Sequence, residues 1–285
     1  MQSVTSILLV TKTRHAAAES TAVSVARWLE ARGVASSTVS AAHPARELAD
    51  RARAADVVLI LGGDGTFVGV GRKLAGIDVP LLGINFGQVG FLTELSADDW
   101  QPGLERLLAG KMITRTCVLL AWELLRDGKT VAEGHAANDV VVGRGAIARV
   151  LPVRVFVDGE DMGLVRSDGV IVSTPLGSSG YALSAHGPLV HPDVRALTLT
   201  PISPFFKSFP PMTLPVEARI RLETAAPDGS LTVDGQEGLP LCAGDVVRVR
   251  SLEAGLRVLS RTTGTYYRRL RERGFIQTDE PTERP

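Results

Sequence analysis

The chain has 285 residues, enough to build one large or two medium hydrophobic cores, and we expect two domains. Its formal net charge of +0 argues against a nucleic-acid partner, because bulk neutralisation of phosphates needs a strongly basic protein. No apolar run is long enough to span a bilayer, and the N-terminus has no secretory pattern. We therefore expect a cytoplasmic protein that does not engage a membrane.

The cysteines and histidines give no sign of a metal site. Cys117 and Cys242 are the only 2 cysteines, and they lie far apart between apolar neighbours, a context typical of small buried hydrophobes. The 5 histidines show no zinc-ligand spacing. We expect no metal held by protein ligands alone.

Strand and helix patterns alternate in the first third of the chain. Apolar runs predict strands over 6–10, 56–61 and 80–85, and amphipathic patterns predict helices over 16–32, 45–54, 66–75 and 98–109. This alternation predicts an α/β domain with a doubly wound, mainly parallel sheet. Ligands of such sheets bind beyond the carboxyl ends of the strands, where Asp64 and Asn85 both fall.

Short apolar runs separated by Asp-Gly turns replace this pattern from about residue 113. They predict an all-β second domain with strands over 118–125, 139–142, 153–157, 169–172, 196–200, 219–223 and 245–250. A basic helix over 266–273 and a polar tail, which we expect to be disordered, end the chain. We interpret the charges of this helix as a solvated face. The predicted domains are 1–112, 113–260 and a terminal segment 261–285 that packs back on the first domain.

The turn Gly62-Gly63-Asp64-Gly65-Thr66 carries the strongest chemical signal of the first domain. It follows an apolar strand, and we expect Thr66 to cap the next helix and Gly76 to end it. Glycines let backbone approach a ligand, and free amides at a helix N-terminus favour anions. A carboxylate there opposes an anion, so Asp64 indicates chemistry: holding Mg²⁺ between phosphates or accepting a proton from a hydroxyl. An ordinary tight turn is the alternative.

Two further segments place polar or aromatic groups at strand ends. The loop over 83–93 is rich in glycine, and Phe86 within it could cover an adenine ring or simply anchor the loop. Asn138-Asp139 leads into a β-branched strand. The Asn138 amide could bind a ribose hydroxyl because it donates and accepts at once, although a polar turn is the plainer interpretation.

The segment over 167–188 is the most unusual part of the chain. A strand ends at Thr174, and small and hydroxyl side chains follow, with Tyr181 as the single large ring among them. Such residues expose amides as an anion-binding nest and offer hydroxyls to phosphate or ribose. A Ser/Gly linker would not be framed by an apolar strand and an aromatic. Val233-Asp234-Gly235-Gln236, further on, is typical of a hairpin turn.

Taken in this order, these segments resemble the NAD kinase family, from the strand at 56 to the C-terminal helix. The turn over 62–66 is shared with diacylglycerol, sphingosine and phosphofructo-kinases, whereas the segment over 168–188 is specific to the family. The resemblance implies a kinase that phosphorylates the adenosine ribose 2′-hydroxyl of NAD to give NADP, with ATP or polyphosphate as donor. It also implies Mg²⁺ or another divalent metal carried by the phosphates, and a homo-oligomer, a dimer or tetramer, that binds NAD partly across a subunit interface.

Site residues follow from the resemblance by matching position. It implies Asp64 as the catalytic carboxylate and a donor-phosphate loop of Gly62, Gly63, Gly65 and Thr66. The residues expected around NAD are Asp64, Gly65, Phe86, Asn138, Asp139, Arg149, Arg166, Asp168, Ser179, Gly180, Tyr181, Ala182, Leu183, Ser184, Ser203 and Gln236. His186 and Phe205 depart from the family's usual residues, which leaves fine substrate preference open.

Donor binding must work without a Gly-x-x-x-x-Gly-Lys-Ser/Thr pattern, because the chain has none. Our hypothesis is that Asp64 takes the hydroxyl proton while metal and the amides of 62–66 hold the donor phosphates. Arg72, Lys73 and the basic C-terminal helix are the candidate cations. A lipid kinase, which would need an apolar pocket, and a non-catalytic dinucleotide sensor are the alternative functions.

Overall fold

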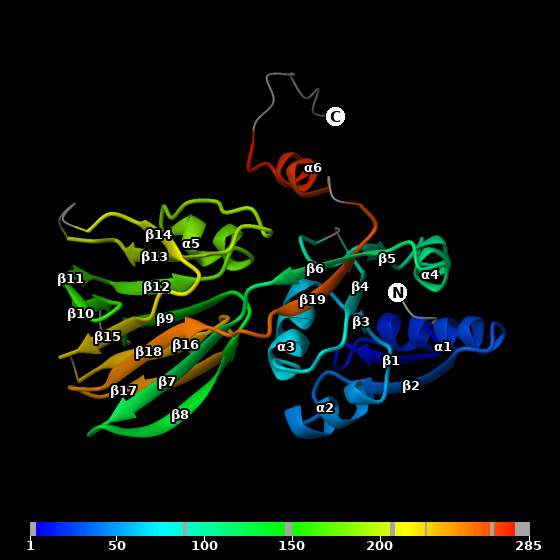
Figure 1. Ribbon diagram of the computed structural model, residues 1–285, viewed down its shortest axis with the longest axis horizontal. Coiled ribbons are helices and arrows are strands. Elements are labelled where there is room, and N and C mark those ends of the chain that lie inside the picture. Colours follow the sequence, from blue (N-terminus) through cyan, green and yellow to red (C-terminus); the bar gives the residue numbers. More distant parts are fainter. Residues whose placement is uncertain are drawn as a thin grey trace.

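The computed structural model describes residues 4–87, 90–145, 150–205, 209–225, 227–262 and 265–276. An α/β region and a β region lie side by side, and the last helix lies above them (Figure 1). Among the described residues, no helix combines the length and apolar character that crossing a membrane requires.

One seven-stranded sheet forms the centre of the α/β region. Its strands are β1 (Ser6–Thr11), β2 (Ala35–Ser40), β3 (Val57–Leu61), β4 (Leu81–Asn85), β5 (Leu95–Ser96), β6 (Ile113–Cys117) and β19 (Leu256–Ser260). The order is β2-β1-β3-β4-β19-β6, with β5 beside β4. Strands β1 to β4 pair in parallel, which confirms the doubly wound α/β fold. The polar edge strand β2 had no apolar pattern to predict it, since only Val39 in it is buried.

Helices cover both faces of this sheet. They are α1 (Ala16–Glu30), α2 (Ala45–Arg53), α3 (Asp64–Lys73) and α4 (Gln101–Leu108). Leu59 of β3 belongs to the core under α1 and α4, whereas Val58 and Ile60 belong to the core under α2 and α3. Both faces of β3 are buried, which explains why its sequence is continuously apolar.

Helix α3 begins two residues earlier than the sequence predicted. Gly63 is its N-cap and Asp64 its first residue, so Thr66 is not the cap. The Thr66 side chain lies against Gly62 instead, where an added Cβ would stand 2.7 Å from the Thr66 Oγ1. Asp64 therefore lies in the first helical turn, where the helix dipole stabilises a carboxylate. Gly76 follows the end of α3 with φ +80°, a conformation that favours glycine.

Two six-stranded antiparallel sheets make up the β region. The first runs β11-β10-β15-β18-β7-β8 and the second β14-β13-β12-β9-β16-β17. Their bounds are β7 (Leu120–Arg126), β8 (Lys129–Ala136), β9 (Asp139–Arg144), β10 (Leu151–Val157), β11 (Glu160–Ser167), β12 (Gly169–Ser173), β13 (Ala196–Ile202), β14 (Met212–Pro215), β15 (Ile220–Thr224), β16 (Gly229–Val233), β17 (Glu237–Leu241) and β18 (Val246–Ser251). Val153 and Val249 from the first sheet share one core with Val140 and Val170 from the second.

The sheet that β6 and β19 join and the burial of Cys242 differ from the sequence expectations. β6 and β19 fell within the predicted β domain of 113–260, but β19 pairs with β4 and with β6, so both complete the α/β sheet. The residue pattern of a short alternating strand does not indicate which sheet the strand joins. Cys242 is exposed rather than buried, whereas Cys117 is buried as expected.

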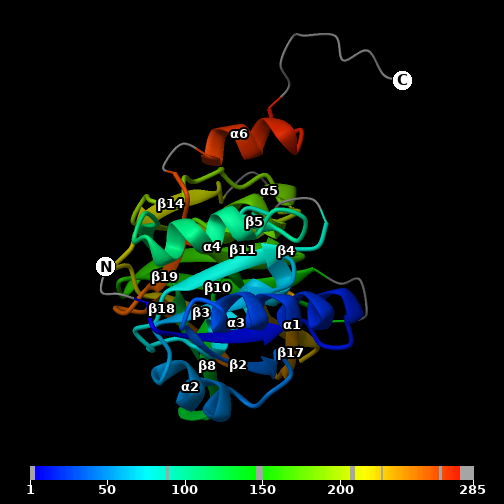
Figure 2. The ribbon, with the colours of Figure 1, turned by 90° about the vertical axis from the view of Figure 1, so that its right-hand side faces the viewer.

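The C-terminal helix α6 (Thr265–Glu272) lies on top of the molecule in both views (Figures 1 and 2). The Tyr266 ring packs edge to face against His191 of the β region, and Arg269 donates hydrogen bonds to residues 91 and 94 of the α/β region. The helix is therefore not simply a solvated charged face, because Arg269 is buried while Arg271 is exposed. The tail over 277–285 lies outside the described residues.

Candidate active site

Two cavities open on the two sides of the turn over 234–237. The first, of about 570 Å³, is lined by residues that include Lys12, Gly63, Thr66, Arg72 and Gln236, and we call it the cationic cavity. The second, of about 600 Å³, is lined by residues that include Asn138, Asp139, Asp168, Tyr181 and Asp234, and we call it the acidic cavity. The turn thus contributes Gln236 to one cavity and Asp234 to the other.

The cationic cavity lies where the strand order of the α/β sheet reverses. The chain passes from β1 to β2 on one side and then to β3 on the other side of β1. Lys12 follows the end of β1, and Gly63 follows the end of β3. Open α/β sheets bind their ligands at this switch point, beyond the carboxyl ends of the strands. The position of the cavity is therefore the one that the sheet topology dictates.

Three cations border this cavity, but their environments differ. Lys12 is exposed. Lys73 donates its ammonium hydrogens to the carbonyls of Ala41 at 2.8 Å and His43 at 3.0 Å, and burial together with the charge of Arg72 lowers its pKa. Lys73 therefore ties the end of β2 to α3. This leaves Lys12 and Arg72 as the better phosphate partners.

Arg72 is the buried cation of the cavity. Its side chain is only 10% exposed and forms an ion pair with Glu237 at 3.0 Å. Its Nη1 is buried and has no hydrogen-bond partner within the described part of the chain. A guanidinium with spare donor capacity, in a cavity that the first residues of α3 also line, favours an anionic ligand there.

Asp64 lies under a loop rather than in open solvent. Its Oδ2 accepts the Phe91 N–H at 2.7 Å, and its Oδ1 accepts the Leu92 N–H, the Thr93 N–H and the Thr93 hydroxyl, each at 3.2 Å. Gly90 lies so close that an added Cβ would stand 1.7 Å from Asp64 Oδ1, which requires glycine there. The loop orients the carboxylate.

The two Asp64 oxygens differ in what they can still accept. A carboxylate oxygen has two lone-pair directions, and Oδ1 receives three hydrogen bonds. Oδ2 receives one from the described residues. Oδ2 is therefore the oxygen that can accept a further proton or hydroxyl group.

Asp234 builds the acidic cavity by holding a backbone segment. Its carboxylate accepts the N–H groups of Ala137, Asn138 and Asp139 at distances of 2.7 to 3.1 Å. The neighbouring segment packs tightly on this one, because a Cβ at residue 177 would stand 2.2 Å from the Asn138 carbonyl oxygen. The glycine at 177 thus lets the 174–184 segment lie against Asn138.

Carboxylates dominate the charge of the acidic cavity. Burial, and then the charge of Asp234, raise the pKa of Asp139 to about 7. Burial also raises the pKa of Asp234, against the lowering effect of its three amide hydrogen bonds. Asp168 is paired with Arg144, whose Nε lies 3.2 Å from its Oδ1. Such groups suit the recognition of hydroxyls, because a carboxyl or carboxylate can donate to or accept from them.

The two cavities gather about half of the predicted residues. Those lining the cationic cavity are Gly63, Gly65, Thr66 and Gln236, and those lining the acidic cavity are Asn138, Asp139, Asp168, Gly180 and Tyr181. Gly62 lies buried in the turn beneath Thr66. Those outside both linings are Asp64, which lies under the loop described above, and Phe86, Arg166, Ser179, Ala182, Leu183, Ser184 and Ser203. Arg149 lies outside the described residues.

Local packing explains several of these differences. The ring of Phe86 lies 5.2 Å from that of His15. Ala182 belongs to a small core with Val141 and Ile171. The expected amide nest is partly used up, because the amides over 177–180 donate within the segment as it forms the 3₁₀ turn η1 (Gly177–Ser179) and the short helix α5 (Tyr181–Ser184).

Sequence reasoning missed Asp234, Arg144, Glu237 and Lys12. The Asp-Gly pair at 234–235 is typical of a hairpin turn, and Asp234 indeed has a φ of +51° there, so its second role was hidden. Lys12 could have been found, since the residues that follow β1 adjoin the switch point. The sequence around Arg144 and around Glu237 gives no indication that either residue lines a cavity.

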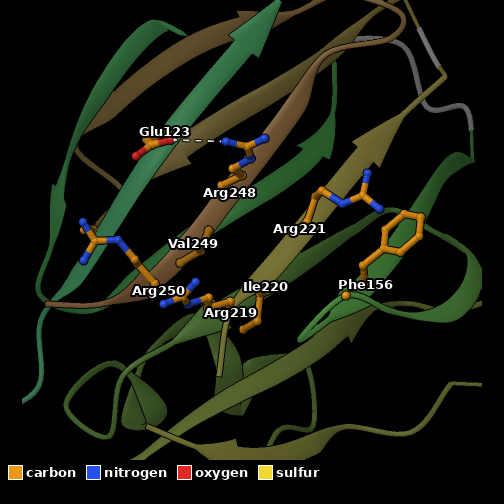
Figure 3. A pocket seen from close by; sticks show the side chains of 10 residues that line it. Glu123, Phe156, Arg219, Ile220, Arg221, Arg248, Val249 and Arg250 are labelled. Atoms are coloured by element: carbon orange, nitrogen blue, oxygen red, sulfur yellow. Dashed lines mark ion pairs between the residues drawn. The ribbon is translucent and has the colours of Figure 1, made fainter. Parts of the chain in front are cut away.

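A third cavity, of about 490 Å³, lies on the outer face of the first β sheet (Figure 3). Two of its arginines are paired: Arg248 faces Glu123 at 3.9 Å, and Arg221 pairs with Glu223 and lies 3.5 Å from the Phe156 ring centre. None of the predicted site residues lines it. This is a solvated charged face rather than the site.

Comparisons with known proteins point to one family. The family model for the ATP-NAD kinase N-terminal domain matches residues 45–112, and the one for the ATP-NAD kinase C-terminal domain matches residues 137–259. The NAD kinase of Lawsonia intracellularis is 42% identical over 98% of this chain and 99% of its own length. The NAD kinase of Nitratidesulfovibrio vulgaris (strain DSM 19637 / Miyazaki F) is 45% identical over 95% of this chain and 97% of its own.

Solved structures agree on the fold. Yeast NADH kinase complexed with NADH superimposes with a TM-score of 0.87 at 24% identity, over 99% of this chain and 91% of that one. An NAD kinase from Archaeoglobus fulgidus in complex with ATP gives 0.76 at 24% identity, over 93% and 97%. The family resemblance and the fold class are thereby confirmed, and nothing in the comparisons supports a lipid kinase. This chain belongs to the NAD kinase family of enzymes.

Proposed function

We propose that this enzyme transfers a phosphoryl group from ATP to the 2′-hydroxyl of the adenosine ribose of NAD, giving NADP. Family membership supports the reaction. The structural observation that carries the proposal is the pair of cavities of opposite charge on the two sides of the turn over 234–237. Phosphoryl transfer needs a site for each substrate and a carboxylate at their junction.

The cationic cavity is the proposed donor site. Lys12, Arg72 and the amides at the start of α3 supply positive potential in place of the missing P-loop lysine. The donor-loop residues Gly63, Gly65 and Thr66 line the same cavity.

The acidic cavity is the proposed NAD site. Asn138 and Asp139 offer polar groups for ribose hydroxyls, and the exposed ring of Tyr181 offers a face for a base. Phosphate groups suit this cavity less well, because three carboxylates line it and Arg144 is their one cationic neighbour among the described lining residues. We further propose that Gln236, which donates to the Gly65 carbonyl at 2.9 Å, holds the two substrate sites together.

Asp64 is the proposed catalytic residue. With Oδ1 occupied by three hydrogen bonds, Oδ2 receives the proton from the ribose hydroxyl as its oxygen bonds to the γ-phosphorus and the bond from that phosphorus to the ADP oxygen breaks. Such general-base assistance is typically worth about 10² to 10⁴ in rate.

A divalent metal fits this site only as a partner of the donor phosphates. The described residues contain no group of three or more side chains that could hold a metal ion, and Glu237 is already paired with Arg72. Mg²⁺ keeps several waters and binds phosphate oxygens readily, so the donor phosphates would hold it while the remaining position on Asp64 Oδ2 stays open for the hydroxyl proton. The metal would neutralise charge on the transferring phosphoryl group.

We also propose a homo-oligomer, a dimer or tetramer, that acts in the cytoplasm. The exposed rings of Tyr181 and Phe205, 49% and 66% exposed, lie on segments that flank the acidic cavity and offer apolar surface to a second copy. The two cysteines are free, which suits a reducing compartment. Analytical ultracentrifugation with and without NAD tests the assembly.

The test of function is product formation by the purified protein. We expect NADP, read out with an NADP-specific dehydrogenase, when the protein is mixed with Mg²⁺, ATP and NAD. Parallel reactions replace ATP by polyphosphate and NAD by diacylglycerol. Absence of NADP with phosphorylation of the lipid would support the lipid-kinase alternative, and binding of NAD without any turnover would support the sensor.

A further inference from the structure

The loop that holds Asp64 is itself held by the C-terminal helix. We call residues 90–94 the clamp loop. Its amides face Asp64, and its opposite edge faces α6 and the end of β19. The proposed function gives a role to Asp64 but none to the contacts on that edge.

Arg269 of α6 makes two hydrogen bonds to the clamp loop. Its Nη1 donates to the Phe91 carbonyl at 2.7 Å, and its Nη2 donates to Glu94 Oε2 at 2.6 Å. The N–H of the same residue, Phe91, donates to Asp64 Oδ2. One residue therefore separates the guanidinium of Arg269 from the carboxylate of Asp64.

Glu94 is a buried anchor with several partners. Its side chain is 3% exposed, and that of Arg269 is 10% exposed. The Arg261 backbone N–H donates to Glu94 Oε1 at 3.0 Å, and the Ser260 hydroxyl donates to Oε2 at 3.3 Å. The Arg261 guanidinium also pairs with it, at 3.5 Å between Nε and Oε1, and a buried carboxylate with this many partners is held in one geometry.

Aromatic packing reinforces the same contact. The Phe91 ring lies 6.1 Å from the Tyr266 ring and 5.6 Å from the Phe275 ring. The Arg273 guanidinium lies 4.8 Å from the centre of the Phe91 ring. Both the backbone and the side chain of Phe91 are thus set by the C-terminal segment.

We propose that Arg269 is a positioning residue for catalysis, which fixes the clamp loop so that its amides hold Asp64 in the reactive orientation. This inference rests on the proposed catalytic role of Asp64. It assigns the last helix, more than 200 positions from Asp64 along the chain, to the active site. A small misplacement of a reacting group costs up to about a hundredfold in rate, so the effect on turnover should be measurable.

Arg269→Lys is the variant that tests this. Lysine keeps the charge that Glu94 needs but cannot hold the Phe91 carbonyl and Glu94 together in the geometry of a planar fork. We expect kcat to fall about tenfold while KM for NAD and for ATP changes less than about threefold. Arg271→Lys is the matched control, since Arg271 is exposed on the same helix, and we expect it to behave like wild type.

A double variant separates positioning from general structural support. If Arg269 acts through Asp64, adding Arg269→Lys to Asp64→Asn should lower kcat by less than about twofold further, because the effects of residues that act as a unit are not additive. Full additivity would overturn the inference while leaving the role of Asp64 intact. Full activity of Asp64→Asn alone would instead remove the proposed catalytic role.

Thermal unfolding confirms that each variant is folded before its kinetics are compared. If Arg269→Lys does not accumulate as folded protein, Glu94→Gln carries the same test, since it keeps the shape of the anchor and weakens its hold on Arg269. A kcat equal to that of the Arg271→Lys control, in folded Arg269→Lys or Glu94→Gln protein, would overturn the inference, as would a rise in KM with kcat unchanged.

Discussion

The cationic and acidic cavities are alike in size but differ in how they are built and in the charge they present. The cationic cavity is a consequence of sheet topology, because its residues follow β1, β2 and β3 at the switch point. The acidic cavity is assembled from β9, β13, β16, Asp168 and the 180–181 segment, which are distant in sequence. The proposed assignment, phosphates on one side of the 234–237 turn and sugar hydroxyls on the other, therefore rests on charge rather than on shape.

Replacing Asp64 by Asn removes the proposed catalytic carboxylate and should have the largest effect. The amide keeps the shape but cannot take a proton, so we expect kcat to fall by about 10² to 10⁴ with the fold retained. Steady-state NADP formation measures it. Asp50→Asn, at an exposed carboxylate on α2, is the control. A folded Asp64→Asn enzyme that turns over like this control would refute the assignment.

Asp139 tests the electrostatics of the acidic cavity through the free energy of unfolding. With its pKa raised to about 7 by burial, the folded state keeps the proton after the unfolded chain has lost it, so Asp139 destabilises the fold increasingly from the unfolded pKa up to about pH 7. Asp139→Asn should therefore raise the free energy of unfolding by roughly 2–4 kcal/mol near pH 8 and by little near pH 4.

Urea unfolding at both pH values, with the exposed Asp50→Asn as control, measures this difference. An equal effect at both pH values would mean that Asp139 ionises normally. The acidic cavity would then lose the property that sets it apart.

Arg72 tests the proposed assignment of the cationic cavity to ATP. Arg72→Met keeps an apolar stem and removes the charge, so we expect KM for ATP to rise about tenfold and KM for NAD to stay within about twofold. Arg46→Met, at an exposed position of α2, should change neither. A rise confined to KM for NAD would reverse the assignment of the two cavities.

Gln236 tests the link between the cavities and should have the smallest effect. Gln236→Leu removes the hydrogen bond to the Gly65 carbonyl, which at an exposed position is worth about 1 kcal/mol in free energy of unfolding. Urea unfolding of this variant, compared with Gln101→Leu on α4, measures it. Equal values for the two variants would show that the link contributes nothing.

The same contrast explains what the sequence could and could not predict. The turn at Asp64 and its place beyond β3 follow from local pattern and topology, and so does the doubly wound sheet. Other features depend on contacts between residues that are distant in sequence. These are the hydrogen bonds from the clamp loop to Asp64, those from the Asn138 segment to Asp234, and the pairing of β19 with β4. Arg269 shows the limit most clearly, because its charge pattern predicted a solvated face although the residue is buried against Glu94.

The most direct test of the central claim is a structure of the enzyme with NAD bound. The account predicts the adenosine ribose in the acidic cavity, with its 2′-hydroxyl directed to Asp64 Oδ2 at about 2.6–3.2 Å, or through one water. A nucleotide bound with this hydroxyl on the far side of the 234–237 turn from Asp64, and with its pyrophosphate occupying the cationic cavity, would contradict it.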